Sequence, residues 1–84
     1  MNKQQAKKII GRTVVSKSGQ KFGIVRDISF ETRTGELLYV VLGNPTSHAA
    51  KLDLEKNKSG EATIPFSSVV SVGDFIIVEE EDIV

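Results

Sequence analysis

The stretch KFGIVRDISFETRTGELLYVVL, residues 21–42, decides the fold. Two apolar runs flank a short polar connection containing Thr and Gly, which is typical of a β-hairpin with a longer loop. The second run, residues 36–42, is apolar on both faces: one carries Leu38, Val40 and Leu42, and the other carries Leu37, Tyr39 and Val41. A strand of this kind needs a cover on each face.

The side chains of Leu37, Tyr39 and Val41 form the candidate interface. We expect them to point outward, while the alternate set faces the core. Three large apolar side chains together are rarely exposed on a soluble monomer. Either a second copy of the chain covers them, as in an isologous homodimer, or the N-terminal arm does so through Ile9 and Ile10. We favour the homodimer.

Further short strand patterns follow in the rest of the chain. β-Branched and alternating apolar residues predict strands at 11–16, 49–55 and 61–66 and a tight hairpin at 69–78. A short helix remains the alternative for residues 49–55, and without that segment the patterns give six strands. Strands this short and closely spaced predict an all-β fold, a small six-stranded antiparallel β-barrel.

Glycines mark the turns of this predicted fold. Gly19, Gly35 and the pair Gly73–Asp74 lie at expected turns, and a positive φ is expected at Gly19 and Gly73. Gly23 lies inside a predicted strand, where glycine indicates a bulge or the close approach of another backbone segment.

The composition is that of one small domain. A chain of 84 residues has a marginal core and gains from burial by association. The chain has no cysteine, which excludes disulfides, thiolate metal sites and a Cys nucleophile. Small secreted domains usually carry disulfides, so we expect a cytoplasmic location. No apolar run is long enough to span a bilayer, and we expect no membrane insertion.

The charges are unevenly distributed although the net charge is zero. Residues 1–33 carry eight Lys or Arg and two Asp or Glu, whereas residues 34–84 carry three Lys and nine Asp or Glu. Such asymmetry is typical of nucleic-acid binding by the basic half. The favoured alternative is that the basic arm neutralises the acidic tail, within one chain or across a dimer.

No residue pattern indicates an enzyme. Asp27 and Asp74 are the acids that a catalytic hypothesis would choose, but structural roles are expected for both. The single histidine, His48, has no neighbouring ligands for a metal. Ser67, Ser68 and the other hydroxyl residues lack a base at motif spacing. We therefore predict no catalytic, cofactor or metal site.

Several of these segments resemble the PRC-barrel family, which is named from the cytoplasmic domain of the photosynthetic reaction centre H subunit. They are GRTV at 11–14, SGQKFGIVRDI at 18–28, TGEL at 34–37, IPF at 64–66, Val70, VGD at 72–74 and IV at 77–78. The resemblance covers residues 9–78, so we expect a basic arm at 1–8, the barrel at 9–78 and an acidic tail at 79–84.

The resemblance implies a short stand-alone protein of archaeal type, a non-enzymatic adaptor that homodimerises and binds a still unidentified protein. Some archaeal relatives are implicated in cell division, which is one assignment to test. The family also includes the C-terminal domain of a bacterial ribosome-maturation factor. An RNA- or ribosome-associated barrel, acting in RNA processing or ribosome maturation, is therefore the alternative.

Overall fold

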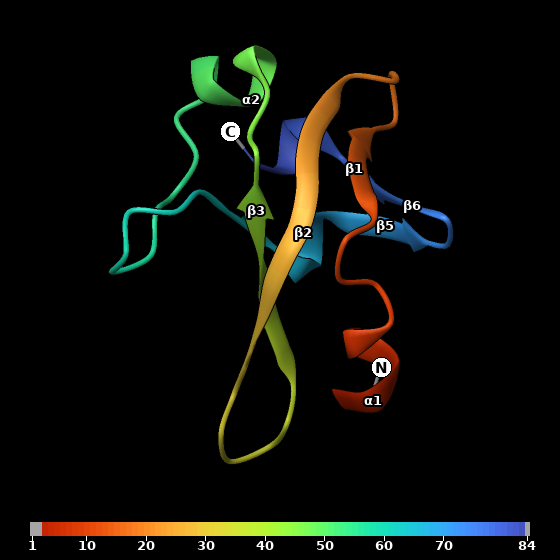
Figure 1. Cartoon of the computed structure of the whole chain (residues 1–84), viewed down its shortest axis with the longest axis vertical. Coiled ribbons are helices and arrows are strands. Elements are labelled where there is room, and N and C mark those ends of the chain that lie inside the picture. Colours follow the sequence, from red (N-terminus) through yellow and green to blue (C-terminus); the bar gives the residue numbers. More distant parts are fainter. Residues whose placement is uncertain (1–2, 84) are drawn as a thin grey trace.

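The computed structural model describes residues 3–83, which form one six-stranded sheet with short helical segments around it (Figure 1). The strands are β1 (Thr13–Ser16), β2 (Lys21–Phe30), β3 (Leu37–Gly43), β4 (Thr63–Pro65), β5 (Val69–Val72) and β6 (Phe75–Val78). The helical segments are α1 (Lys3–Lys7), α2 (Ser47–Lys51) and the 3-10 turns η1 (Phe66–Ser68) and η2 (Glu80–Asp82).

The strand order across the sheet is β4-β3-β2-β1-β6-β5. The predicted six-stranded β fold is confirmed, but the sheet is not wholly antiparallel and does not close. β1 and β6 are parallel, with Thr13 opposite Phe75 and Ser16 opposite Val78. β5 and β6 form a tight antiparallel hairpin, and the second strand of this hairpin, β6, runs parallel to β1 and pairs with its edge. β4 and β5 are therefore left as sheet edges.

The long strand β2 is the centre of the sheet and bends through two irregularities opposite β3. Gly23, near its start, has φ +151°, and a Cβ there would lie 2.6 Å from the carbonyl oxygen of Gly43. The expected close backbone approach at Gly23 is thus confirmed. A larger residue would push β2 and the end of β3 apart.

The core lies between the faces of the curved sheet and is made of aliphatic side chains around Phe22. Its fully buried members are Val14, Phe22, Val25, Val40, Ile64, Ile76 and Val78. Ile9, which follows α1, is also buried in this cluster, whereas Ile10 is exposed. Only the first of these two isoleucines therefore contributes to the core.

Gly19, Gly35 and Gly73 all lie between strands, as expected, but the positive φ expected at Gly73 is absent. Gly19 has φ +92° and Gly35 has φ +74°. Gly73 does not adopt a positive φ, so its expected left-handed conformation is wrong. The β5–β6 tip is held instead by the Arg12 guanidinium, which donates a hydrogen bond of 2.6 Å to the Gly73 carbonyl oxygen.

The predicted strand at residues 49–55 is also wrong in its first half, where α2 forms. Thr46 caps this helix, because its hydroxyl oxygen accepts a hydrogen bond of 3.2 Å from the Ala49 N–H. The same hydroxyl donates a bond of 2.6 Å to the Lys21 carbonyl, and the Thr46 N–H donates to Phe22. These bonds anchor α2 to β2, and the chain leaves the helix at Leu52, whose backbone is extended.

The two charged ends of the chain lie far apart. α1 and η2 are at opposite ends of the molecule in Figure 1. No lysine of α1 contributes to the ion pairs found within residues 3–83. The expected pairing of residues 1–8 with the tail is therefore not found within residues 3–83, although Lys17 of the basic half lies 3.1 Å from Glu79 of the tail. Ile83 packs against the core, and Val84 and residues 1–2 lie outside the described residues.

Within residues 3–83, the structure has no helix that is both long and apolar enough to cross a membrane.

Candidate interaction surfaces

The predicted interface on β3 is mostly covered by the chain itself. Leu37 and Val41 are only 8% and 5% exposed, and Tyr39 is half-buried. Their outward orientation as one exposed stripe is therefore wrong. Of the two isoleucines that were the alternative cover, Ile9 is buried in the core cluster, whereas Ile10 is exposed beside Ile28 and Phe30.

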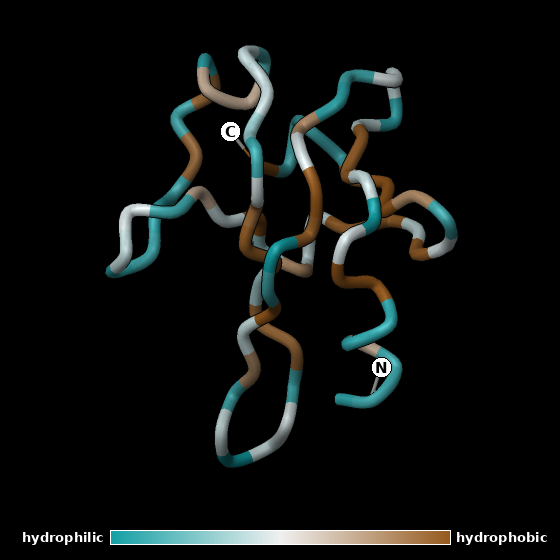
Figure 2. Tube along the Cα trace, viewed as in Figure 1, coloured by the Kyte–Doolittle hydropathy of each residue, from teal (hydrophilic) through white to brown (hydrophobic). Residues whose placement is uncertain are grey.

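Exposed apolar side chains gather instead on the β5–β6 hairpin, which projects from the sheet (Figure 1). Val70 is 52% exposed and Phe75 is 51% exposed, and Val72 is exposed as well. Val72 pairs with Ile76 and shares its face, whereas Phe75, the preceding residue of β6, points to the opposite face. Figure 2 shows hydrophobic strands on both sides of a hydrophilic tip. The hairpin thus exposes apolar groups on both faces.

The two edges of the sheet differ in protection. Edge β4 contains Pro65, and a neighbouring segment hydrogen-bonds at its start, where the Thr63 N–H donates to Glu55 at 2.8 Å. Edge β5 has the sequence VVSV, with neither proline nor charge, and in the sheet formed by residues 3–83 it pairs with β6 alone. Its register with β6 shifts between Val69 and Ser71, so the strand is irregular at Val70. Charges, prolines and bulges all protect natural edge strands from pairing with another chain. β5 is therefore the less protected of the two edges.

A second surface feature is a hollow of about 340 Å³ beside α2, which we call the α2 groove. Its apolar floor includes Leu42, Leu52 and Leu54, and small alanine side chains from α2 and from residue 62 leave the space open. Leu52 and Leu54 lie in the segment that directly follows α2. A backbone bridge between Lys56 and Ala62 fixes the far side.

The rim of the α2 groove is charged. Arg26 Nη1 lies 3.4 Å from Glu61 Oε2, and Asn57 Nδ2 donates to the other carboxylate oxygen of Glu61 at 3.3 Å. Lys56 also lines the groove and forms no ion pair with any residue from 3 to 83. Arg26 neutralises the charge of Glu61, and Asn57 adds a hydrogen bond to the same carboxylate. The positive charge of Lys56 is therefore not balanced by an acidic side chain of the rim.

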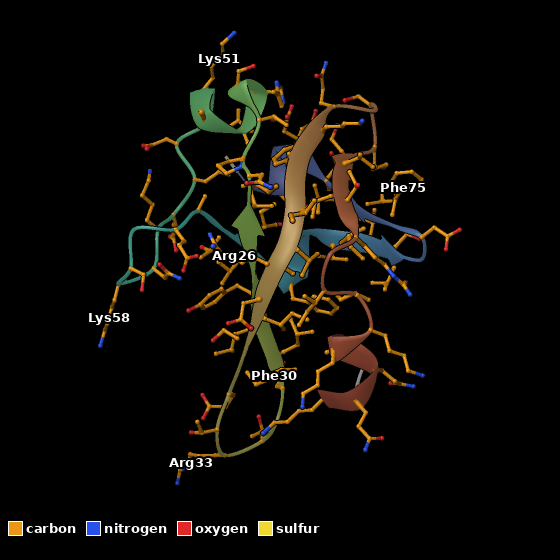
Figure 3. All side chains as sticks on the ribbon, in the orientation of Figure 1. Arg26, Phe30, Arg33, Lys51, Lys58 and Phe75 are labelled. Carbon is orange, nitrogen blue, oxygen red and sulfur yellow. The ribbon has the colours of Figure 1, made fainter. Side chains whose placement is uncertain are left out.

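A third feature is a basic corner where α1 meets the β2–β3 hairpin. Lys3, Lys7, Ile10, Asp27, Ile28 and Phe30 line this hollow. The Lys3 ammonium lies 5.8 Å from the centre of the Phe30 ring, and Figure 3 shows Phe30 facing α1. This corner is the only one of the three features that combines several cations with an aromatic ring.

Asp27 and His48, which a catalytic or metal-binding hypothesis would choose, form hydrogen bonds that hold the local structure. The Asp27 carboxylate accepts a hydrogen bond of 2.8 Å from the Ile28 N–H. His48 shares a hydrogen bond with Glu80 and lies edge-on to Phe22, so it joins α2 to η2. Ser68 Oγ is buried and has no hydrogen-bond partner within residues 3–83. Among the described residues, no cluster of His, Asp or Glu has the arrangement of a metal site.

The sequence model of the PRC-barrel domain matches residues 1–82, nearly the whole chain and including every strand of the sheet. The chain belongs to the PRC-barrel domain family. An uncharacterized protein of the archaeon Methanocaldococcus jannaschii is 25% identical over 83 residues, which cover 99% of this chain and 89% of that protein. The resemblance inferred from the glycine and turn motifs is thus confirmed.

Because β3 is mostly covered in this PRC-barrel domain, the exposed apolar surface lies on the β5–β6 hairpin. The sequence did not identify this hairpin as an interaction surface. Val70, Val72 and Phe75 were assigned to a predicted hairpin but not to a surface. The sequence signal for this surface was the uncharged run VVSV next to FIIV. Such a pattern is equally typical of a buried and of an exposed hairpin, so it did not indicate exposure. The α2 groove gave no local signal, because its lining comes from segments distant in the sequence.

Proposed function

We propose that this PRC-barrel protein is a non-enzymatic protein-interaction module, an adaptor that homodimerises through the β5–β6 hairpin. One observation carries the proposal: β5 is an uncharged edge strand, irregular only at Val70, on a hairpin with exposed apolar side chains on both faces. The absence of cysteine from its 84 residues suits a reducing compartment, and we place the protein in the cytoplasm.

Pairing of β5 with β5 of a second copy is favoured by the chemistry of the strand. An antiparallel pair about a two-fold axis brings apolar VVSV against itself, with no charge opposed to a like charge. Covering half-exposed side chains such as Val70 and Phe75 is worth roughly 1 kcal/mol each. Edge hydrogen bonds add roughly 0.5–1.5 kcal/mol each, before the entropy of association is subtracted. A dimer in the micromolar range is expected.

Sedimentation equilibrium of the full chain tests this proposal. The wild-type protein is expected to dimerise, and Val70→Lys is expected to produce monomers because it places a charge on the pairing edge. Leu38→Lys is the matched control, since Leu38 is an exposed apolar residue on a different hairpin. Thermal melting of each variant verifies that the monomer remains folded.

Two outcomes overturn the proposed dimer. A wild-type protein that is monomeric at micromolar concentration removes it altogether. Dissociation by Tyr39→Glu but not by Val70→Lys would instead place the interface on β3, where Tyr39 is half-buried.

RNA binding is a second candidate function, favoured by the basic corner at α1 and Phe30. Lysines beside an aromatic ring suit the phosphates and bases of a single strand. Double replacement of Lys3 and Lys7 with Gln should then abolish a salt-dependent gel shift of labelled RNA. Failure of the wild-type protein to shift RNA at low salt would remove this candidate.

A further inference from the structure

The α2 groove lies on a different part of the molecule from the β5–β6 hairpin (Figure 1). Both surfaces are therefore available at the same time, which an adaptor requires. We propose that the α2 groove binds an acidic peptide segment of a partner protein, with one large apolar side chain of the peptide buried on the groove floor. This inference rests on the proposed adaptor function and assigns the chemistry of its partner.

The floor determines the apolar part of the ligand. Leu42 and Leu54 are buried in the core cluster and form a rigid base, while Leu52 is half-buried and accessible from the groove. Alanines along the walls leave a volume of about 340 Å³, which suits a side chain such as Leu, Met or Phe. Burial of such an anchor in a preformed apolar hollow is typical of short-peptide recognition.

The rim determines the charge of the ligand. Lys56 has no ion-pair partner among the described residues, and Arg26 is the only cation bound to Glu61. Asn57 also binds the Glu61 carboxylate, so part of the guanidinium of Arg26 remains available to a ligand. A carboxylate next to the apolar anchor meets both cations, whereas a basic peptide would be repelled by them.

Two lysines of the same loop make a matched pair for the test. Lys56 lines the groove, whereas Lys58 does not, and Figure 3 shows Lys58 at the loop tip pointing away from Arg26. Lys56→Glu and Lys58→Glu change the net charge of the protein equally. Only Lys56→Glu is expected to weaken binding, by about tenfold, because it alone reverses a charge at the rim.

The probe is a fluorescein-labelled peptide, Ser-Asp-Asp-Leu-Phe-Glu-Asp-Ser, titrated into the full-length protein by fluorescence anisotropy. The expected Kd is on the order of tens to hundreds of micromolar, which is usual for one anchor and a few charges. Amide chemical shifts should change at Leu52, Leu54 and Ala62 and not at Val70. Ala50→Met, which fills the groove at an exposed position of α2, should abolish binding without loss of folding.

Control peptides distinguish the alternatives. Replacing Leu-Phe by Ser-Ser, or all four acids by Lys, should abolish binding. Binding by the Lys peptide, equal effects of Lys56→Glu and Lys58→Glu, or saturation by sodium decanoate without any binding of the peptide would each overturn the inference. The last result would identify a site for free amphiphiles.

Repeating the titration with Val70→Lys separates this inference from the dimer. Peptide binding to a monomeric Val70→Lys variant supports the groove whether or not the wild-type protein dimerises. A dimeric wild-type protein that binds no peptide would overturn the groove inference alone.

Discussion

The Arg12 guanidinium donates a hydrogen bond of 2.6 Å to the carbonyl oxygen of Gly73, which lies 61 residues further along the chain. Arg12 directly precedes β1, and Gly73 lies at the tip of the β5–β6 hairpin. The bond therefore ties the tip of the projecting hairpin to the body of the sheet. An ordered edge loses less entropy when it pairs with another chain.

Loss of this bond should loosen the hairpin more than the fold. Arg12→Leu is expected to speed amide hydrogen exchange at residues 72–75, with a change in unfolding free energy below about 1 kcal/mol because the bond is exposed. Hydrogen-exchange mass spectrometry of the variant measures the effect. Arg12→Lys, which keeps the charge but not the guanidinium, is the control for electrostatics. Unchanged exchange at 72–75 in Arg12→Leu would show that the bond does not order the tip.

Gly23 and Gly73 are expected to respond in opposite ways to a methyl group. At Gly23 the added Cβ would lie 2.6 Å from the Gly43 carbonyl oxygen, at φ +151°. Gly23→Ala should therefore lower the unfolding free energy by about 2–4 kcal/mol. At Gly73 nothing lies within 4 Å of the added Cβ and φ is not positive.

Gly73→Ala is thus the matched control, with an expected change between zero and a gain of about 1 kcal/mol. Urea unfolding of both variants measures the difference. Equal destabilisation of the two would contradict the close approach of β2 to the end of β3.

The parts of the fold that could be predicted are those fixed by neighbouring residues. The β2–β3 hairpin follows from alternation on both sides of the Thr-Gly loop, and the glycines at 19 and 23 mark backbone geometries that other residues resist. Each of these depends on a few consecutive side chains. The sequence therefore contained the necessary information locally.

The parallel pairing of β1 with β6 and the start of α2 could not be predicted in this way. In residues 49–55 the alternation of Leu52 and Leu54 with charged residues is typical of a strand. The helix forms because Thr46 bonds both the Ala49 N–H and the Lys21 carbonyl, which lies 25 residues away. Contacts at that separation have no signature in a local pattern.

The interface assignment was wrong for a related reason. Alternation separates two faces of a strand but does not say which one the rest of the chain covers. Leu37 and Val41 are buried by other parts of the chain, whereas Val70 and Phe75 remain about half exposed although Ile76 and Val78 of the same hairpin are buried in the core. Coverage is a property of tertiary packing.

The hydroxyl of Thr46 should stabilise the fold, because it holds α2, which lines the α2 groove, against β2. Thr46→Val keeps the shape but leaves the Ala49 N–H and the Lys21 carbonyl without this partner, which should cost about 1–2 kcal/mol. Thr46→Ser retains the hydroxyl and should cost less than about 0.5 kcal/mol. Denaturant unfolding measures both variants. A Thr46→Ser variant as unstable as Thr46→Val would mean that the methyl group matters and the cap does not.

The C-terminal segment should stabilise the fold through packing more than through charge. Ile83 is half-buried against the core, so Ile83→Ser should lower the unfolding free energy by about 1–2 kcal/mol at both low and high salt. Glu81, two residues earlier, is exposed and forms no ion pair among residues 3–83. Glu81→Gln should therefore change stability by less than about 0.5 kcal/mol, and by less still at high salt.

Thermal and urea unfolding at two salt concentrations separate the two contributions, because screening weakens exposed charges and leaves apolar burial intact. An Ile83→Ser effect that disappears at high salt would contradict the packing of this segment on the core. It would point instead to an electrostatic role for the acidic residues that surround it.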